Sequence, residues 1–254
     1  MQEFATKTIR EIALEAPLTT RVFEEFKIDF CCGGRVPFAE ACEIAGVDPT
    51  VMMSKLEAVI NTARSEGVVA GDQRSPSELI EFIVSTHHEF TRDEFSRLLP
   101  LMDKVAGKHG ENHPELFEIK RLFQELAADL MPHMQKEERV LFPYIEKVEA
   151  ATEGRSPVPM ASFGTVENPV RMMMFEHEAA GDLLRQMRSL SSDYTTPDGA
   201  CPSYKGLYAG IEDLERDLHQ HIHLENNVLF PQAIELENKL LSETKMAQMS
   251  QALL

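Results

Sequence analysis

Two short segments of the chain combine histidine and glutamate at a spacing that suits a metal ion. The segments are HMQKEERVLFP at 133–143 and HIHLENNVLFP at 221–231. In each, a histidine precedes a glutamate by four residues: His133 with Glu137, and His221 with Glu225. Residues four apart lie on one face of a helix, so the imidazole and the carboxylate can reach a common point. Both groups are common ligands of transition metals, and the pairs therefore predict metal binding.

A single histidine precedes each segment at a nearly equal distance. His88 lies 45 residues before His133, and His177 lies 44 residues before His221. The repeat predicts two helical hairpins, each of which supplies two histidines and one glutamate. The alternative is a duplicated hairpin whose shared Val-Leu-Phe-Pro ends only pack together.

Helix geometry separates the remaining histidines from the predicted ligands. His219 and His223 also lie four apart, but two residues rotate by about 200° around a helix, so they face away from the 221 and 225 positions. They are expected on the solvent side of the helix or at its edge. The repeat offset favours His88 over its neighbour His87, whereas His109 and His113 fall in a loop, where the first could line an entrance.

The helical faces select six candidate ligands. Glu138 lies off the face that carries His133 and is expected at the surface. Six ligands exceed the four that a structural zinc site needs. If each glutamate bridges, two ions each receive two imidazoles and two carboxylate oxygens, which suits a dinuclear non-haem iron site, with manganese as the alternative metal. The candidate set is His88, His133, Glu137, His177, His221 and Glu225.

Such a site would keep positions for small molecules. One turn after His177 stands Gly181, which has no side chain to coordinate and leaves room beside the metal. With four protein donors per ion, we expect an oxo or hydroxo bridge and an exchangeable position on the metal pair.

Two adjacent cysteines form a second candidate site. Bridging Cys31 and Cys32 by a disulfide would strain the peptide between them. Lys27 and Arg35 stand nearby in the sequence and could lower a thiol pKa. The functional interpretation is a redox or iron-transfer pair; the alternative is a pair of packing residues near a helix end. The other two cysteines are expected to be ordinary buried or incidental thiols: Cys42 and Cys201.

The segments between these motifs are predominantly helical in pattern. Pro17 separates two short helices in 6–30, and the paired glycines that follow Cys32 offer a left-handed stop for the second of them. Asp48 is expected to cap a later helix whose first residue is Pro49. The expected helices are 38–45, 49–63, 75–99, 115–149, one from Pro169 onward, and 203–231, with a helical tail over 232–254. Pro143 and Pro231 are expected to end their helices.

Four long helices predict an all-α protein, an up-down-up-down four-helix bundle with its ligands in the interior. A segment poor in periodicity, with two glycines, lies near 64–75 and is the expected domain boundary. The predicted domains are a small helical domain over 1–66, which carries the CCGG motif, and the bundle over 75–254.

Composition excludes several classes of partner. The formal net charge of −17 argues against nucleic acid and anionic membrane surfaces. The chain shows no apolar run that could cross a bilayer, and its charged start does not suit a signal peptide. Four cysteines in 254 residues make no disulfide framework. We therefore expect a cytoplasmic protein.

The motifs together resemble the iron–sulfur cluster repair di-iron proteins, the repair of iron centres family. The resemblance rests on DFCCGG near the start, HMQKEE with LFP, EHEAAG, and HIHLENNVLFP. It implies a hemerythrin-like bundle and the same six iron ligands, with the two glutamates bridging. The family commonly has Tyr before the first ligand and a second His three residues after it, where this chain has His87 and Thr91.

The resemblance implies a di-iron protein that repairs iron–sulfur clusters damaged by nitrosative or oxidative stress, by donating iron from a labile centre. Its partners would be proteins with damaged clusters and small ligands such as nitric oxide or O2, and the sequence allows a homodimer. Two alternatives are a nitric oxide reductase and an O2 or redox sensor. Reaction of nitric oxide at the paired irons would make the protein an enzyme; repair alone would not.

Overall fold

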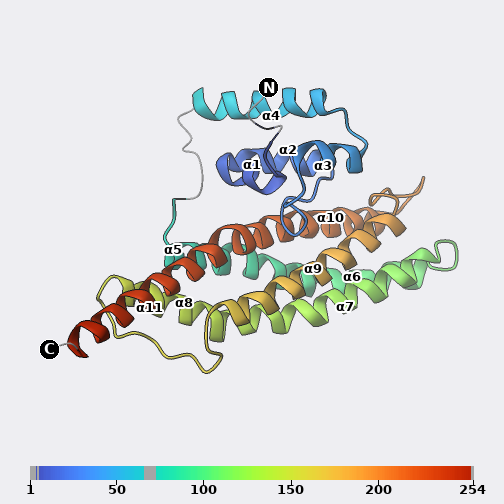
Figure 1. Ribbon diagram of the computed structural model, residues 1–254. Coiled ribbons are helices and arrows are strands. Elements are labelled where there is room, and N and C mark those ends of the chain that lie inside the picture. Colours follow the sequence, from blue (N-terminus) through green and yellow to red (C-terminus); the bar gives the residue numbers. More distant parts are fainter. Residues whose placement is uncertain (1–3, 5, 66–72, 253–254) are drawn as a thin grey trace. The chain divides into compact units, whose positions relative to one another are not determined.

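The computed structural model describes residues 4, 6–65 and 73–252 (Figure 1). Its secondary structure is helical, and no strand occurs within these residues. This confirms the all-α prediction. The expected boundary falls largely on residues 66–72, outside the described ranges. The chain separates into two compact units, Met1–Ser75 with His219–Phe230, and Pro76–Leu218 with Pro231–Leu254.

The helices of the first unit begin and end at capping residues. Thr8 and Glu11 form a reciprocal capping box at the first helix. Asp48 accepts a hydrogen bond of 2.7 Å from the backbone N–H of Thr50, as its expected capping role requires. Gly46 ends the third helix with φ of 65°. The helices are α1 (Ile9–Glu15), η1 (Pro17–Thr19), α2 (Thr20–Glu25), α3 (Phe38–Ala45) and α4 (Pro49–Ser65).

The CCGG motif does not end a helix, contrary to the sequence prediction. Helix α2 already ends at Glu25, and the left-handed residue that follows it is Lys27, with φ of 56°. Gly34 is needed for a different reason, because a Cβ there would lie 2.6 Å from the carbonyl oxygen of Phe30. The glycine thus permits a close approach of two backbone segments beside the cysteines.

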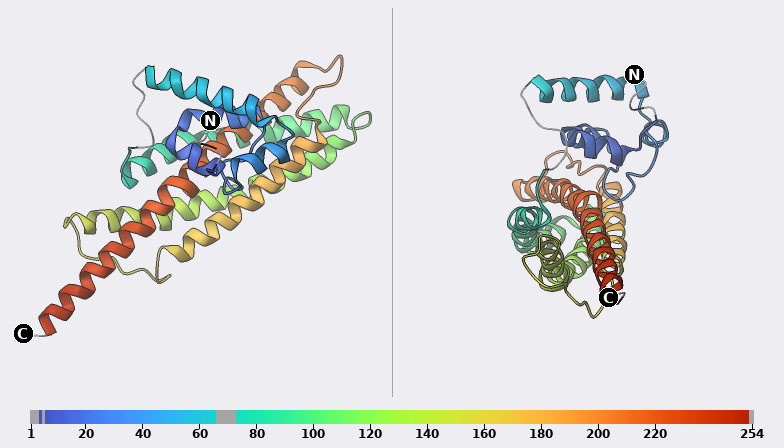
Figure 2. Two further views of the ribbon diagram at one scale, coloured as in Figure 1. Left: turned by 45° about the horizontal axis from the view of Figure 1, so that its top comes forward. Right: turned by 60° about the vertical axis from the view of Figure 1, so that its left-hand side comes forward.

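The described chain from Pro76 onward forms long helices, which are seen nearly end-on in the right-hand view of Figure 2. Of these residues, His219–Phe230 belong to the first unit and the others to the second. Three of the helices change from α to π geometry and back. The segments are α5 (Pro76–Phe82), η2 (Ile83–His88) and α6 (Glu89–His109); α7 (Glu115–Lys136), η3 (Glu137–Leu141) and α8 (Phe142–Thr152); α9 (Glu167–Leu190); and α10 (Pro202–His223), η4 (Leu224–Leu229) and α11 (Phe230–Ala252). η2, η3 and η4 are the π-helical segments.

Prolines do not end these helices, which corrects the sequence prediction. Pro143 and Pro231 are each the second residue after a π segment, and the helix continues beyond them as α8 and α11. Each proline directly follows a change from π to α hydrogen bonding, where the regular i to i−4 pattern is already interrupted. Helix α6 likewise runs through Pro100 to His109.

An apolar core fills one end of the bundle. It comprises buried side chains from α6, α7, α9 and α10, among them Phe95, Phe123, Leu184 and Leu214. Elsewhere in the unit, Glu237 accepts hydrogen bonds from the Tyr144 hydroxyl and the Val166 backbone N–H. None of the described helices combines the length with the low content of charged residues that a membrane-spanning helix requires.

The Gly34→Ala variant should lose about 1–3 kcal/mol of stability, since the added Cβ meets backbone atoms that cannot move aside. The measurement is the free energy of unfolding in urea. Gly33→Ala is the matched control, because its Cβ would meet only the side chain of Asp29. Equal stability of both variants and the parent protein would contradict this role of Gly34.

Candidate metal centre

All six predicted ligands lie in two overlapping groups in the bundle interior. In each group one atom from every residue lies within 4.8 Å of the others. Both Glu137 and Glu225 belong to both groups, whereas each histidine belongs to one. The groups are His88, Glu137, His221 and Glu225, and His133, Glu137, His177 and Glu225.

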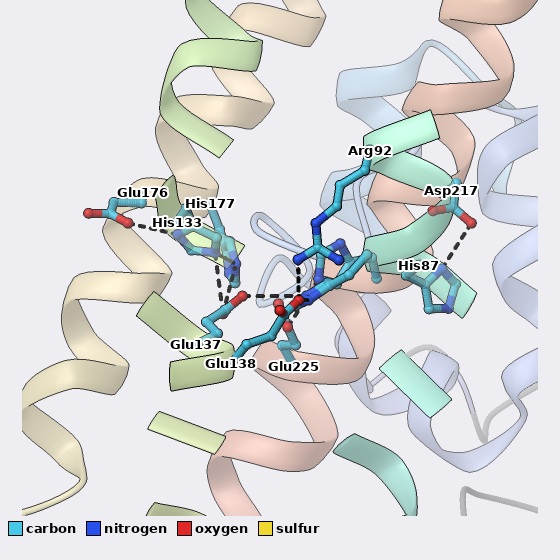
Figure 3. A network of polar contacts seen from close by, with 11 residues as sticks. His87, Arg92, His133, Glu137, Glu138, Glu176, His177, Asp217 and Glu225 are labelled. Carbon is cyan, nitrogen blue, oxygen red and sulfur yellow. Dashed lines mark hydrogen bonds and ion pairs between the residues drawn. The ribbon is translucent and has the colours of Figure 1, made fainter. Parts of the chain in front are cut away.

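The two oxygens of Glu137 face different histidines. Oε1 lies 3.2 Å from Nε2 of His133 and 3.9 Å from Nε2 of His177. Oε2 lies 3.5 Å from Nε2 of His88. Figure 3 shows His133 and His177 turned toward Glu137 from one side. One oxygen toward each group is the arrangement of a bridging carboxylate.

The imidazoles also converge on one another. Nε2 of His177 lies 2.9 Å from Nε2 of His133, so at most one of these nitrogens carries a proton in that contact. The second glutamate stands similarly close to its helical neighbour, with Oε1 of Glu225 3.0 Å from Nε2 of His221. Converging Nε2 atoms and carboxylate oxygens form a mixed nitrogen and oxygen donor set.

Burial makes this donor set unfavourable without a cation. The side chain of Glu137 is 0% exposed, and neither of its oxygens forms a hydrogen bond. An ionised carboxylate in such a place is costly unless a positive charge neutralises it. The residues present therefore fit a metal, whose charge would offset the buried carboxylates.

The π segments coincide with the ligands. η2 ends at His88, η3 begins at Glu137, and η4 includes Glu225. A π turn inserts one residue into a helix and shifts the side chains that follow, and such turns are frequent at functional sites. The insertion leaves no signal in the spacing of His and Glu, so the sequence did not predict it.

The carboxylate of Glu138 contacts His88 on the side of the ring opposite to Glu137. Oε1 of Glu138 lies 2.7 Å from Nδ1 of His88, and Arg92 donates to the same oxygen. Burial alone would raise the pKa of Glu138, but the hydrogen bonds from Arg92 and His88 hold it below its usual value. An ionised carboxylate only accepts, so Nδ1 of His88 carries the proton and Nε2 is left for a metal.

The other hairpin carries an equivalent support. Oε2 of Glu176 lies 2.7 Å from Nδ1 of His133 (Figure 3). Lys136 donates to both oxygens of Glu176. The prediction that Glu138 is merely a surface residue is therefore wrong, and sequence reasoning missed Glu176. The signal present in the sequence was a glutamate directly beside a ligand residue in each hairpin, Glu138 beside Glu137 and Glu176 beside His177.

The neighbouring histidines serve other contacts. Nδ1 of His87 lies 2.9 Å from Oδ1 of Asp217, and His87 belongs to neither ligand group. His223 is 3% exposed, contrary to the prediction of a solvent position, because the ring of Phe30 packs against it. His219 keeps part of its surface and pairs with Glu24.

Gly181 is buried one turn after His177. The atoms nearest to a Cβ added there belong to the guanidinium of Arg185, at 3.3 Å. That Gly181 leaves room beside the metal stays a prediction.

The adjacent cysteines differ from one another. Cys31 is 6% exposed and its sulfur lies 3.3 Å from Oδ1 of Asp29, whereas Cys32 is partly exposed. Hydrogen bonding with Cys32, together with burial, raises the pKa of the Cys31 thiol well above its usual value. Asp29 also accepts from the backbone N–H groups of both cysteines, at 3.0 and 2.9 Å. Within the same unit, Asn227 donates to the carbonyl oxygen of Phe30.

Cys201 has the surroundings of a reactive thiol, although the sequence suggested an ordinary one. It precedes α10, and the backbone N–H groups of Tyr204 and Ser203 lower the pKa of its thiol, with Lys108 and Lys104 adding to the effect. Nε2 of His109 lies 3.2 Å from the sulfur. His109 thus faces this cysteine, where the sequence had suggested an entrance residue.

These surroundings predict an order of alkylation by iodoacetamide at neutral pH. Cys201 should react first, Cys32 next, and Cys31 and Cys42 last, because burial raises the pKa of Cys42 as well. Peptide mass spectrometry after timed quenching measures the order. Rapid labelling of Cys31 in the folded protein would contradict the described burial.

The Glu138→Gln variant should bind metal about 10–100-fold more weakly, because an amide supports the imidazole less well than a carboxylate. Competition with a chelator measures the affinity. Glu178→Gln changes an exposed carboxylate next to His177 and is the matched control. Because hydrogen bonds hold the pKa of Glu138 below its usual value, its support of His88 should be lost at a more acidic pH than the support of an unperturbed glutamate would be. Equal affinities of the two variants would refute the supporting role.

Comparison with known proteins places these features in a family. Residues 79–233 match the hemerythrin HHE cation binding domain, and residues 5–60 match ScdA_N, a domain of unknown function, DUF542. The chain is 32% identical to the iron–sulfur cluster repair protein ScdA of Staphylococcus haemolyticus over 222 residues, which cover 87% of this chain and 95% of the relative.

Two further relatives agree. The chain is 33% identical to the iron–sulfur cluster repair protein YtfE of Edwardsiella ictaluri and 31% identical to a probable iron–sulfur cluster repair protein of Haemophilus influenzae. Each match covers 91% of this chain and 98% of the relative. The chain therefore belongs to the family of iron–sulfur cluster repair proteins, and its bundle is a hemerythrin HHE cation binding domain.

Proposed function

We propose that this protein repairs damaged iron–sulfur clusters by supplying iron from a pair of ions held between the four histidines and two glutamates. The observation that carries the proposal is the sharing of both carboxylates by the two ligand groups. A single metal ion would need only one group. The names of the relatives support the repair role.

The donor chemistry favours iron. Each group offers two imidazoles and two carboxylates, and this mixture suits iron, whereas thiolate ligands are absent from both groups. Iron held there would supply redox chemistry and open positions for exchangeable ligands. Nε2 of each histidine and the oxygens of Glu137 and Glu225 would hold it, with an oxo or hydroxo bridge completing the pair.

The partial exposure of Glu138 and Glu176, which contact ligand histidines, supports a centre that can release its metal. The side chains of Glu138 and Glu176 are 26% and 28% exposed, and each touches a ligand histidine at Nδ1. His88 and His133 are themselves buried, but the carboxylates that contact their Nδ1 atoms are reached by solvent. Proteins with damaged clusters are the proposed recipients, and nitric oxide and O2 are the proposed small ligands.

We further propose that the chain is organised as a small helical domain over 1–66 and the bundle over 75–254, and that the first assists through Cys31 and Cys32. Cys32 is the more accessible thiol of the pair. With Cys31 held as a thiol beside Asp29, the exposed neighbour is the group that would meet a partner or a transferred ion.

The Glu137→Leu variant should lose most of its bound iron and its ability to restore a damaged cluster, since both ligand groups lose a shared carboxylate. The metal-free variant should be at least as thermally stable as the metal-free parent, because it no longer buries a carboxylate without a hydrogen bond. Iron analysis, a cluster-repair assay and thermal unfolding measure the three effects.

His113→Gln is the control for this variant, because His113 belongs to neither ligand group and should leave iron content unchanged. Normal iron content in Glu137→Leu would refute the assignment of Glu137 as a metal ligand. Normal iron content with no transfer to a damaged cluster in the parent protein would retain the site and reject the repair function.

A further inference from the structure

Four residues occupy equivalent positions beside the ligand histidines. Each lies three residues from its histidine, toward the loop that closes its hairpin. Three of them are apolar members of the bundle core and at most 3% exposed: Leu130, Ala180 and Leu218. The fourth is Thr91, which is 0% exposed. Thr91 is therefore the one polar residue among these four buried positions.

Thr91 lies on the buried face of its helix, three residues after His88. His88, Thr91, Phe95 and Leu98 follow one another at spacings of three and four residues, and all are at most 2% exposed. They form the interior stripe of this helix. Side chains on a helix lean toward its N-terminus, so the side chain of Thr91 leans back toward the turn of His88, whose Nε2 faces Glu137.

The hydroxyl of Thr91 has no hydrogen-bond partner within the described protein. A buried threonine in a helix usually donates to a backbone carbonyl in the preceding turn. Here the preceding turn is the end of the π segment η2 (Ile83–His88), and this bond does not form. Buried polar groups are rarely left unpaired unless a ligand or water completes them.

We infer that Thr91 donates a hydrogen bond to a small acceptor molecule bound at the metal pair, and so selects among the small ligands that enter the site. The inference rests on the proposed function, since it requires the bound metal. Thr91 is a positioning residue for that ligand, not a metal ligand.

Azide is the probe for this inference, because it is a three-atom hydrogen-bond acceptor that binds oxidised iron. The full chain, loaded with iron and oxidised in air, is titrated with sodium azide and followed by absorbance. Thr91→Val removes the hydroxyl and keeps the shape of the side chain, whereas Thr91→Ser keeps the hydroxyl. We expect the Kd for azide to rise about tenfold in Thr91→Val, the loss of one charge-assisted hydrogen bond, and to change less than about twofold in Thr91→Ser.

A second readout uses the metal-free proteins. Thr91→Val should raise the thermal midpoint of the metal-free protein, because it removes a buried hydroxyl without a partner. If Thr91 served only in packing, Thr91→Val would not be expected to raise the thermal midpoint and at the same time weaken azide binding. A lower midpoint in Thr91→Val would show a protein partner for the hydroxyl and overturn the inference.

The remaining outcomes separate this inference from the proposed function. Equal azide affinity of Thr91→Val and the parent protein, at equal iron content, overturns the inference alone. A parent protein that retains iron but does not bind azide also overturns it and leaves the iron site standing. A parent protein that binds no iron overturns both.

Discussion

The buried carboxylate of Glu137 is the constraint on which the bundle interior depends. It is 0% exposed, has no hydrogen bond, and sends one oxygen toward each of two sets of histidines. Removing one partner of a buried ion pair typically lowers the stability of a protein by about 3–5 kcal/mol, because the remaining charge is left uncompensated. A buried carboxylate without a neutralising cation destabilises the core for the same reason. A cation shared between the two groups resolves this cost, so metal binding and stability of the interior are linked.

The surrounding structure holds the ligands in place on two levels. π segments at three of the four ligand-bearing helices set the direction of the side chains, and partly exposed carboxylates fix two of the histidines through Nδ1. Arg92 and Lys136 in turn neutralise those carboxylates. This arrangement joins a buried centre to partly exposed charges, as the proposed release of iron would require.

Part of this structure follows from sequence and part does not. The helical bundle was predictable because apolar periodicity and the repeated His-x-x-x-Glu pair each require a helix with an inward face. The continuation of the helices through Pro143 and Pro231 was not, because a π turn depends on tertiary packing and leaves no mark on residue spacing. Glu176 was missed for a similar reason, since its partner His133 lies on another helix. The burial of His223 likewise depends on Phe30, which is remote in sequence.

The most direct test of the proposed centre is metal analysis with Mössbauer spectroscopy on protein isolated without oxygen. We expect two iron ions per chain, antiferromagnetically coupled through a bridge, because both carboxylates are shared by the two ligand groups. One tetrahedral zinc ion per chain, or two uncoupled irons, would contradict it.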